Sequence, residues 1–103
     1  MRFLLKVTIP VQSGNAAAKA GKLGATIKSI LTDLNPEAVY FTDTNGQRTG
    51  LIFLEMQDAS QIPAIAEPWF LAFNAGVEIH PVMAPEDLER ASGAIEKAVK
   101  KYA

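Results

Sequence analysis

The sequence predicts an α+β fold in which four strands and two main helices follow one another in the order β-α-β-β-α-β, with a further helix near the C-terminus. Apolar residues occupy every second position from Phe3 to Ile9, which is typical of a strand with one face in the core. Apolar residues recur at spacings of three and four from Ala16 to Leu34, which is typical of an amphipathic helix. Asn45-Gly46 lies between two β-prone segments, and both residues tolerate the positive φ of a tight hairpin.

The first half of the chain contains the first strand and the first main helix. The strand places Phe3, Leu5, Val7 and Ile9 on one face and Leu4, Lys6 and Thr8 on the other, and Pro10 ends it. A single helix then follows the cap residues Ser13-Gly14-Asn15 and ends at Asn35-Pro36. Gly21 and Gly24 each cost this helix about 1 kcal/mol relative to alanine. We therefore expect them to let it approach a sheet or another helix closely.

The second half supplies the remaining strands and helices. Residues 37–42 and 48–56 form antiparallel neighbours around the hairpin, and a second helix opens at Asp58 with Pro63 in its first turn. Pro68 lacks a backbone N–H, so we expect this helix to end or kink at Glu67. Residues 77–82 form the fourth strand, and Pro85 begins the last helix. The apolar stripe of that helix comprises Leu88, Ala91, Ile95, Ala98, Val99 and Tyr102.

This order of elements is the ferredoxin-like arrangement, in one domain spanning residues 1–103. Right-handed crossovers place both main helices on one face of a four-stranded antiparallel sheet. The strands are nevertheless apolar on both faces, since Leu51 and Phe53 alternate with Ile52 and Leu54. We therefore expect a homodimer in which two sheets pack back to back. The alternative is a monomer whose last helix covers part of the second face.

The segment of residues 51–83 resembles the corresponding part of the dimeric α+β barrel superfamily, and most of all muconolactone isomerase-like proteins. The resemblance rests on a strand, a short helix, a Pro-aromatic segment and a final strand, with matches at Pro68, Phe70, Val77, Glu78, Pro81 and Val82. The whole chain is also similar to small bacterial domains of this superfamily. The resemblance implies the fold and the dimer. It implies no particular activity, because the superfamily includes isomerases, cofactor-independent monooxygenases and haem-degrading enzymes.

Composition excludes several classes of function. Ten basic and eleven acidic residues give a net charge of −1, which argues against nucleic acid or an anionic membrane as the main partner. Lys97, Lys100 and Lys101 are better explained by a helix C-terminus than by a binding patch. The chain has no cysteine and one histidine, so we expect no metal site and no cofactor. No signal-peptide pattern or membrane-length apolar run appears, and we expect a cytoplasmic protein.

Glu78 and His80 are the candidate catalytic residues. They stand two residues apart on the fourth strand and therefore share one face, where a carboxylate can orient an imidazole for proton transfer. The alternative is an inert hydrogen-bonded pair at the rim of a dimer interface. Lys6 is a further possible partner of Glu78. However, we expect the first and fourth strands to flank the third, which leaves a Lys6–Glu78 contact open.

An apolar pocket is the other candidate site. Trp69, Phe70 and Phe73, with Tyr40 and Phe41, supply aromatic walls, and few polar groups accompany them, as in many small-molecule sites. The candidate ligand-binding residues are Trp69, Tyr40, Arg48, Asn74 and Phe73. The alternative is that these aromatic side chains only close the core beyond Pro68.

Three functions therefore stay open from the sequence. The first is a homodimeric domain that binds a small organic ligand. The second is a cofactor-independent isomerase or monooxygenase-like enzyme acting on a small organic or aromatic acid through His80 and Glu78. The third is a structural or interaction module. A pocket lined by both His80 and Trp69 favours the enzyme, whereas a dry packed interface at these residues favours the module.

Overall fold

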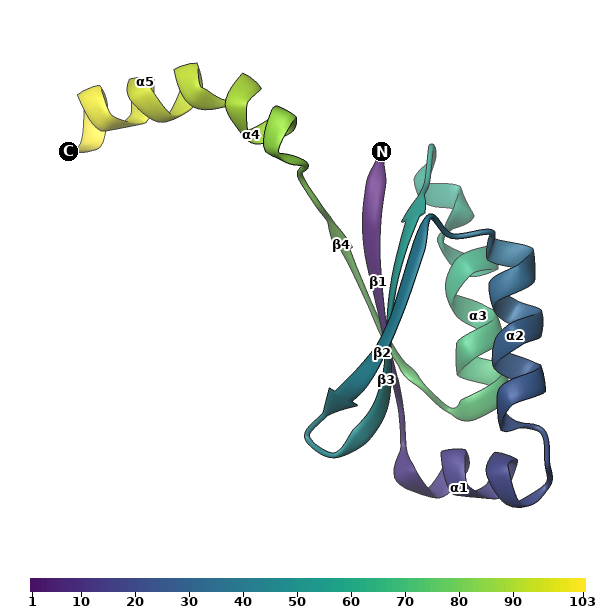
Figure 1. The fold of residues 1–103 in the computed structure, drawn as a ribbon. Helices are drawn as coiled ribbons and strands as arrows, with labels where there is room; N and C mark the ends of the chain where they lie inside the picture. Colours follow the sequence, from purple (N-terminus) through teal and green to yellow (C-terminus); the bar gives the residue numbers. More distant parts are fainter.

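A computed structural model describes all residues, Met1–Ala103. Four strands form one antiparallel sheet in the spatial order β2-β3-β1-β4, namely β1 (Arg2–Ile9), β2 (Ala38–Thr44), β3 (Gln47–Glu55) and β4 (Gly76–Pro81). Helices α2 (Leu23–Leu34) and α3 (Ile62–Phe73) cover one face of this sheet, and α1 (Val11–Lys19) lies across one end (Figure 1). This topology is compatible with the ferredoxin-like arrangement and confirms the predicted α+β class.

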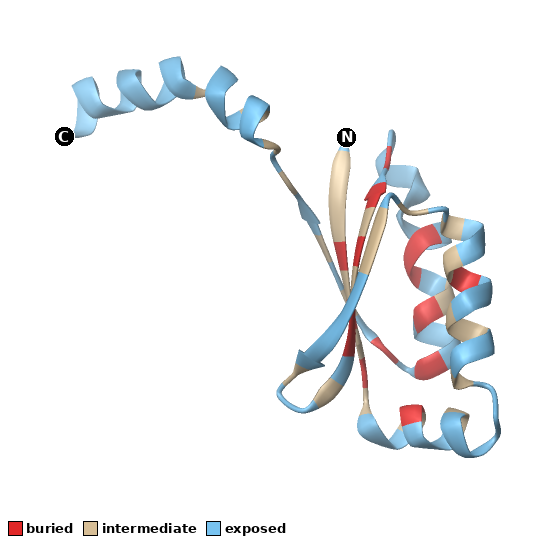
Figure 2. Ribbon diagram, in the orientation of Figure 1, coloured by how far each residue is buried: buried red, intermediate tan, exposed pale blue.

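The core lies between the sheet and helices α2 and α3, and its members alternate along the strands as predicted. In β1, Leu5 and Val7 are each 1% exposed, and Ile52 of β3 is fully buried opposite Leu5. Trp69 and Phe73 of α3 complete the centre of the core, with their ring centroids 6.4 Å apart. Figure 2 places the buried residues in this layer and leaves the opposite face of the sheet without a cover.

The uncovered face is called the open face below. Register pairs Leu4 of β1 with Phe53 of β3, and Leu51 of β3 with Tyr40 of β2, so these four side chains lie on that face. The first three are half-buried and Tyr40 is 63% exposed. The prediction that the strands carry apolar residues on both faces is therefore confirmed.

The first helical segment differs from the prediction of one helix after Ser13-Gly14-Asn15. Those three residues lie inside α1, which begins directly after Pro10 and has no side-chain cap. The helix then breaks at Gly21, whose φ of 71° is left-handed, and α2 begins at Leu23. Gly21 therefore serves a turn between two helices, since glycine adopts this conformation without steric cost. No neighbouring atom comes near Gly24, so close approach does not explain it.

Of the two outcomes expected at Glu67, an end of the helix there is wrong. A short 3-10 turn, η1 (Ala59–Gln61), opens this segment, and α3 then continues through Pro68 to Phe73. Pro68 lacks the N–H that would donate to the carbonyl of Ala64. The second half of the helix nevertheless carries Trp69 and Phe73 into the core. Burial of these two large rings, at about 25 cal/mol per Å², outweighs the loss of one helical hydrogen bond.

The C-terminal segment contains α4 (Pro85–Arg90) and α5 (Ser92–Tyr102), which begin at Pro85 as predicted. Neither helix has a buried residue, and both project from the end of β4 (Figures 1 and 2). The radius of gyration is 17.2 Å, whereas about 13 Å is expected for a rounded chain of this length. The last helix thus does not cover the open face of its own chain.

Candidate functional site

A cavity of about 200 Å³ lies between the core face of the sheet and helices α2 and α3. Its apolar wall consists of Val7, Ile9, Ile27, Phe41 and Trp69, and the rest consists of Thr42, Arg48, Thr49 and Gly50. Phe41, Thr42 and Arg48 are the exposed members of this lining. The cavity therefore opens near the β2–β3 hairpin and ends inside the core.

Trp69 is the one side chain in the structure with a buried polar atom that has no hydrogen-bond partner. Its ring is 2% exposed, and it lines the cavity from the side of α3. A buried N–H left without an acceptor costs about 1–3 kcal/mol. An acceptor atom placed in the cavity within reach of Nε1 would remove this cost.

Arg48 lies at the opening of the cavity, and its neighbours on α1 fix the position of its guanidinium. Its Nη2 donates to Oδ1 of Asn15 at 3.0 Å, and its guanidinium packs against α1 where Gly14 provides the space. A β-carbon at Gly14 would lie 2.5 Å from Nη1 of Arg48, so glycine is required there for this arrangement. Arg2 and Arg90 are each paired with a carboxylate, whereas Arg48 is not.

Glu78 and His80 lie on the open face, on the side of the sheet opposite the cavity. His80 Nε2 is 3.2 Å from Glu78 Oε1, and Lys6 Nζ is 4.0 Å from Glu78 Oε2. The expectation that the first and fourth strands flank the third is wrong, because β1 lies between β3 and β4 and pairs Lys6 directly with Glu78. The three side chains thus form a polar row that runs from the inner strand β1 to the edge strand β4 on the open face.

The other predicted ligand residues lie outside this cavity. Tyr40 lies on the open face with Leu51, away from Trp69 and Arg48. Phe73 and Asn74 line a second, broader hollow between α1 and the end of α3. There Ser13 Oγ donates to the carbonyl of Phe73 at 2.6 Å. Trp69 and Arg48 are therefore the two predicted ligand residues that share the first cavity, and His80 does not line it.

Gly14, Ile27 and Gly50 belong to this site but were not predicted from the sequence. Gly50 lies on the core face of β3, where the missing side chain leaves part of the cavity open. A β-carbon there would contact Phe41 and Ile52 at 3.8 Å, an ordinary van der Waals distance. An isolated glycine within a strand pattern indicates such space, and Gly50 is an isolated glycine in the predicted strand of residues 48–56.

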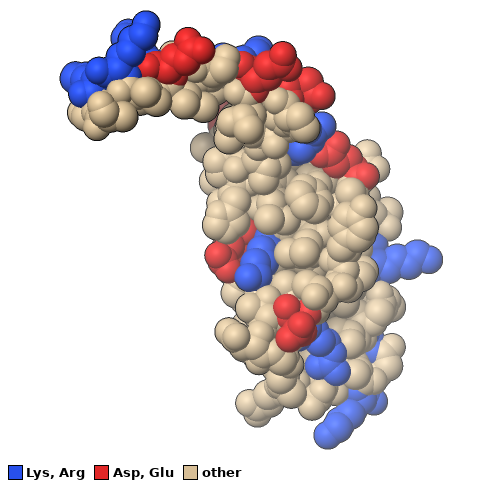
Figure 3. Space-filling view, turned by 60° about the vertical axis from the view of Figure 1, so that its left-hand side comes forward, with Lys and Arg blue, Asp and Glu red and all other residues tan.

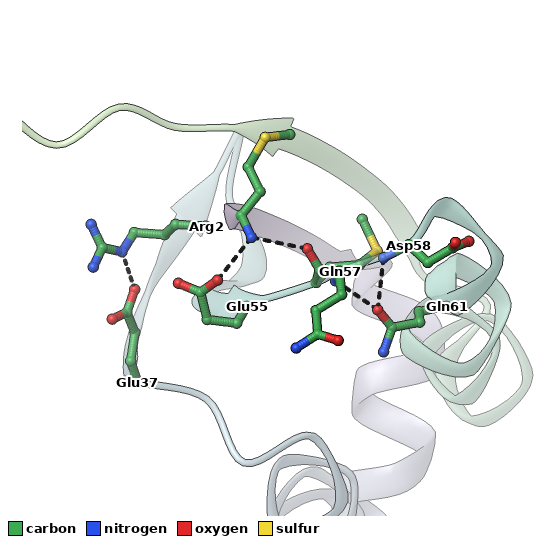
Figure 4. Close-up of polar contacts among 8 residues, drawn as sticks. Arg2, Glu37, Glu55, Gln57, Asp58 and Gln61 are labelled. Carbon is green, nitrogen blue, oxygen red and sulfur yellow. Dashed lines mark hydrogen bonds and ion pairs between the residues drawn. The ribbon is translucent and has the colours of Figure 1, made fainter. Parts of the chain in front are cut away.

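Polar contacts at the opposite end of the sheet stabilise the loops there (Figure 4). Arg2 Nε donates to Glu37 at 2.5 Å, and this hydrogen bond raises the pKa of the guanidinium. The Asp58 carboxylate accepts from the Ser60 N–H at 2.8 Å, which lowers the pKa of Asp58. Gln61 Oε1 completes the capping box by accepting from the N–H of Asp58.

No group of three or more histidine, cysteine, aspartate or glutamate side chains is arranged to hold a metal ion. None of the helices is both long enough and apolar enough to cross a membrane.

No family model matches this chain, and no curated protein matches it either. The comparisons therefore give no support to the muconolactone isomerase-like resemblance, although the fold expected from it is compatible with the sheet order.

Proposed function

We propose that the protein is a homodimer that binds a small organic acid in the cavity beneath α2 and α3. The ring of the ligand occupies the apolar cavity, a small polar substituent on it accepts from the N–H of Trp69, and its carboxylate lies at the opening near Arg48. The observation that carries this proposal is that Trp69 lines the cavity while its buried Nε1 has no acceptor in the protein.

The size of the cavity supports a ligand of this class. An apolar cavity of about 150 Å³ holds benzene, so about 200 Å³ accommodates a ring of that size with one small polar substituent. The lining is mostly apolar with few polar groups, as is usual for small-molecule sites.

The charge at the opening supports an acid. Arg48 has no carboxylate partner in the protein, and its guanidinium is oriented by Asn15 and by the space at Gly14. A planar guanidinium binds a carboxylate through two parallel hydrogen bonds, which is a strong and directional form of recognition.

Fluorescence tests the ligand site directly, because Trp69 is the only tryptophan in the chain. We expect benzoate to change the emission of Trp69 in a saturable manner and to raise the melting temperature, and benzamide to bind more weakly. The proposal fails if a panel of aryl and short branched carboxylates changes neither the emission nor the melting temperature.

The variant Arg48→Gln distinguishes recognition of the carboxylate from binding of the aromatic ring. We expect this variant to lose about tenfold or more in affinity for benzoate, since a hydrogen bond to a charged group contributes about 1.5–3 kcal/mol. Benzamide should bind the variant and the parent alike. Arg90→Gln is the matched control, because it removes one positive charge far from the cavity, on α4. Equal loss of affinity in both variants would contradict a specific role for Arg48.

The open face supports the dimer. Leu4, Leu51 and Phe53 lie on its two inner strands and Tyr40 lies on the edge strand β2. The Arg2–Glu37 pair and the Glu78–His80 pair lie at its margins, and Lys6 of β1 reaches toward Glu78. Figure 3 accordingly shows a broad uncharged surface on this side with charged groups around it. An apolar centre with a polar rim is the usual composition of a protein interface. Glu78 and His80 then belong to the interface rim, and sedimentation equilibrium at micromolar concentration should give the mass of two chains.

A further inference from the structure

The two C-terminal helices follow each other with only Ala91 between them, and together they are called the arm here (residues 85–102). Ala91 lies between α4 and α5, and the apolar residues Leu88, Ile95, Val99 and Tyr102 recur at spacings of seven, four and three, which is the spacing of one helical face. Leu88, Ile95, Val99 and Tyr102 are 51–80% exposed on that face. A helix with such a stripe ordinarily buries it against another surface.

The direction of the arm is set where it leaves the body. The N–H of Val82 donates to the carbonyl of Arg2, which holds the connection against β1. Pro85 then starts α4, and the carboxylate of Asp87 accepts from the N–H of Ala84 at 2.8 Å and pairs with Arg90. The arm therefore leaves on the side of the open face and runs away from its own sheet (Figure 1).

The dimensions of the arm match those of a second copy on the open face. Two packed sheets lie about 10 Å apart, and a covering helix layer adds about 10 Å more. The arm has eighteen residues and is about 27 Å long at 1.5 Å per residue. It can thus extend along the side of a partner's sheet as far as the partner's helix layer.

The outer part of the arm and the body differ in the sign of their net charge. Helix α5 carries three lysines and one glutamate, which gives +2, whereas the body, residues 1–84, has six basic and seven acidic residues, which gives −1. The lysines lie at the free end of the arm, and the blue group at the tip in Figure 3 marks this end. A second copy of the same chain therefore offers the end of the arm an apolar surface and a body of opposite net charge.

We propose that the arm of each chain clasps a second copy of the chain, so that the stripe Leu88–Ile95–Val99–Tyr102 is buried against the partner. This inference rests on the homodimer proposed above and adds a reciprocal contact outside the sheet face. The two-fold symmetry of a homodimer makes both arms equivalent.

A pair of double variants tests the clasp. Ile95→Ser with Val99→Ser removes the centre of the stripe, and Glu96→Ser with Lys100→Ser changes the adjoining polar surface of the same helix without altering the net charge. Sedimentation equilibrium should show a dimer dissociation constant about tenfold or more higher for the stripe variant and within about twofold of the parent for the control. Neither variant touches the core, so both fold.

The outcomes separate the clasp from the dimer. A dimeric parent whose stripe variant dissociates no more readily than the control overturns the clasp and leaves the sheet-face dimer intact. A parent that is monomeric at all concentrations overturns both proposals.

Hydrogen exchange supplies a second measurement. An isolated helix of eleven residues is marginal in water, so the amides of residues 92–102 should exchange rapidly in dilute monomer and slowly in the dimer. Protection that does not change with protein concentration would mean that the arm packs on its own chain, and it would overturn the clasp.

Discussion

Individual glycines shape the candidate site as much as its side chains do. Gly14 provides the space in which the Arg48 guanidinium lies, and Gly50 leaves the cavity open beside Trp69. Neither glycine has a left-handed backbone, so space and not conformation explains these two positions. The residues that bind a ligand in this proposal thus depend on neighbours that contribute no side chain.

Gly50→Ala tests this role of empty space. The new methyl group has ordinary contacts with Phe41 and Ile52, so the fold accepts it. We expect the free energy of unfolding to rise by about 0.4–1 kcal/mol, because alanine restricts the unfolded chain. We also expect benzoate to bind more weakly, because the methyl group occupies part of the cavity.

The matched control for Gly50→Ala is Gly24→Ala in α2, where a β-carbon meets no neighbouring atom. Denaturant unfolding and fluorescence titration should show a gain in stability in both variants and a loss of affinity in Gly50→Ala alone. Unchanged benzoate affinity in Gly50→Ala would place the ligand elsewhere.

At the scale of the elements, local sequence signals predicted turns and strands better than helix boundaries. Asn45 and Gly46 have positive φ in the hairpin as expected, and Asn35 ends α2 in the left-handed region. These positions depend on backbone sterics, which a few residues determine. Pro68 was misjudged because the burial of Trp69 and Phe73, which overrides its local effect, depends on tertiary packing.

The candidate site was only partly predictable for the same reason. Trp69 and Arg48 were identified from residue type, yet their separation from Tyr40, Asn74 and His80 follows from strand register and from the path of α3. Register pairs residues that are distant in sequence, so no local pattern reveals it.

Pro68→Ala should stabilise α3. A proline inside a helix destabilises the folded state by about 3 kcal/mol, and alanine removes this cost. Alanine also leaves the unfolded chain less restricted, which offsets about 1 kcal/mol of that stabilisation. We therefore expect the free energy of unfolding to rise by about 1–2 kcal/mol, measured by urea denaturation. A decrease would mean that the proline ring makes packing contacts worth more than the restored hydrogen bond.

The capping box before α3 predicts a pH dependence. The N–H of Ser60 lowers the pKa of Asp58 in the folded protein, so the carboxylate stabilises the fold above the ordinary aspartate pKa. This contribution is lost as the pH falls through the lowered value. Asp58→Asn keeps a capping acceptor but does not titrate.

Melting temperatures measured from pH 6 down to pH 3 check the role of Asp58. The parent should lose more stability than Asp58→Asn over the acid part of this range. Asp33→Asn, an exposed change on α2 without a capping contact, is the control for the loss of one negative charge. Parallel curves for the parent and Asp58→Asn would contradict the assignment.

At the scale of the whole molecule, the sheet separates two surfaces with different properties. Helices α2 and α3 cover one face and enclose the cavity. The open face carries apolar residues that nothing in the chain covers. A substitution on the open face should therefore change association without changing the core. Phe53 is the test residue, because it is half-buried at the centre of that face and paired with Leu4.

Phe53→Glu should give a monomer with an intact fold, because a charge at the centre of an apolar interface is buried without a partner when the sheets meet. We expect the dimer dissociation constant to rise by about 30-fold or more, in line with the loss of about 2 kcal/mol at an interface hot spot. Leu71→Glu is the matched control, since Leu71 is 81% exposed on α3, on the other side of the sheet. Equal dimerisation of Phe53→Glu and Leu71→Glu in sedimentation equilibrium, with both circular dichroism spectra unchanged, would place the interface away from the open face.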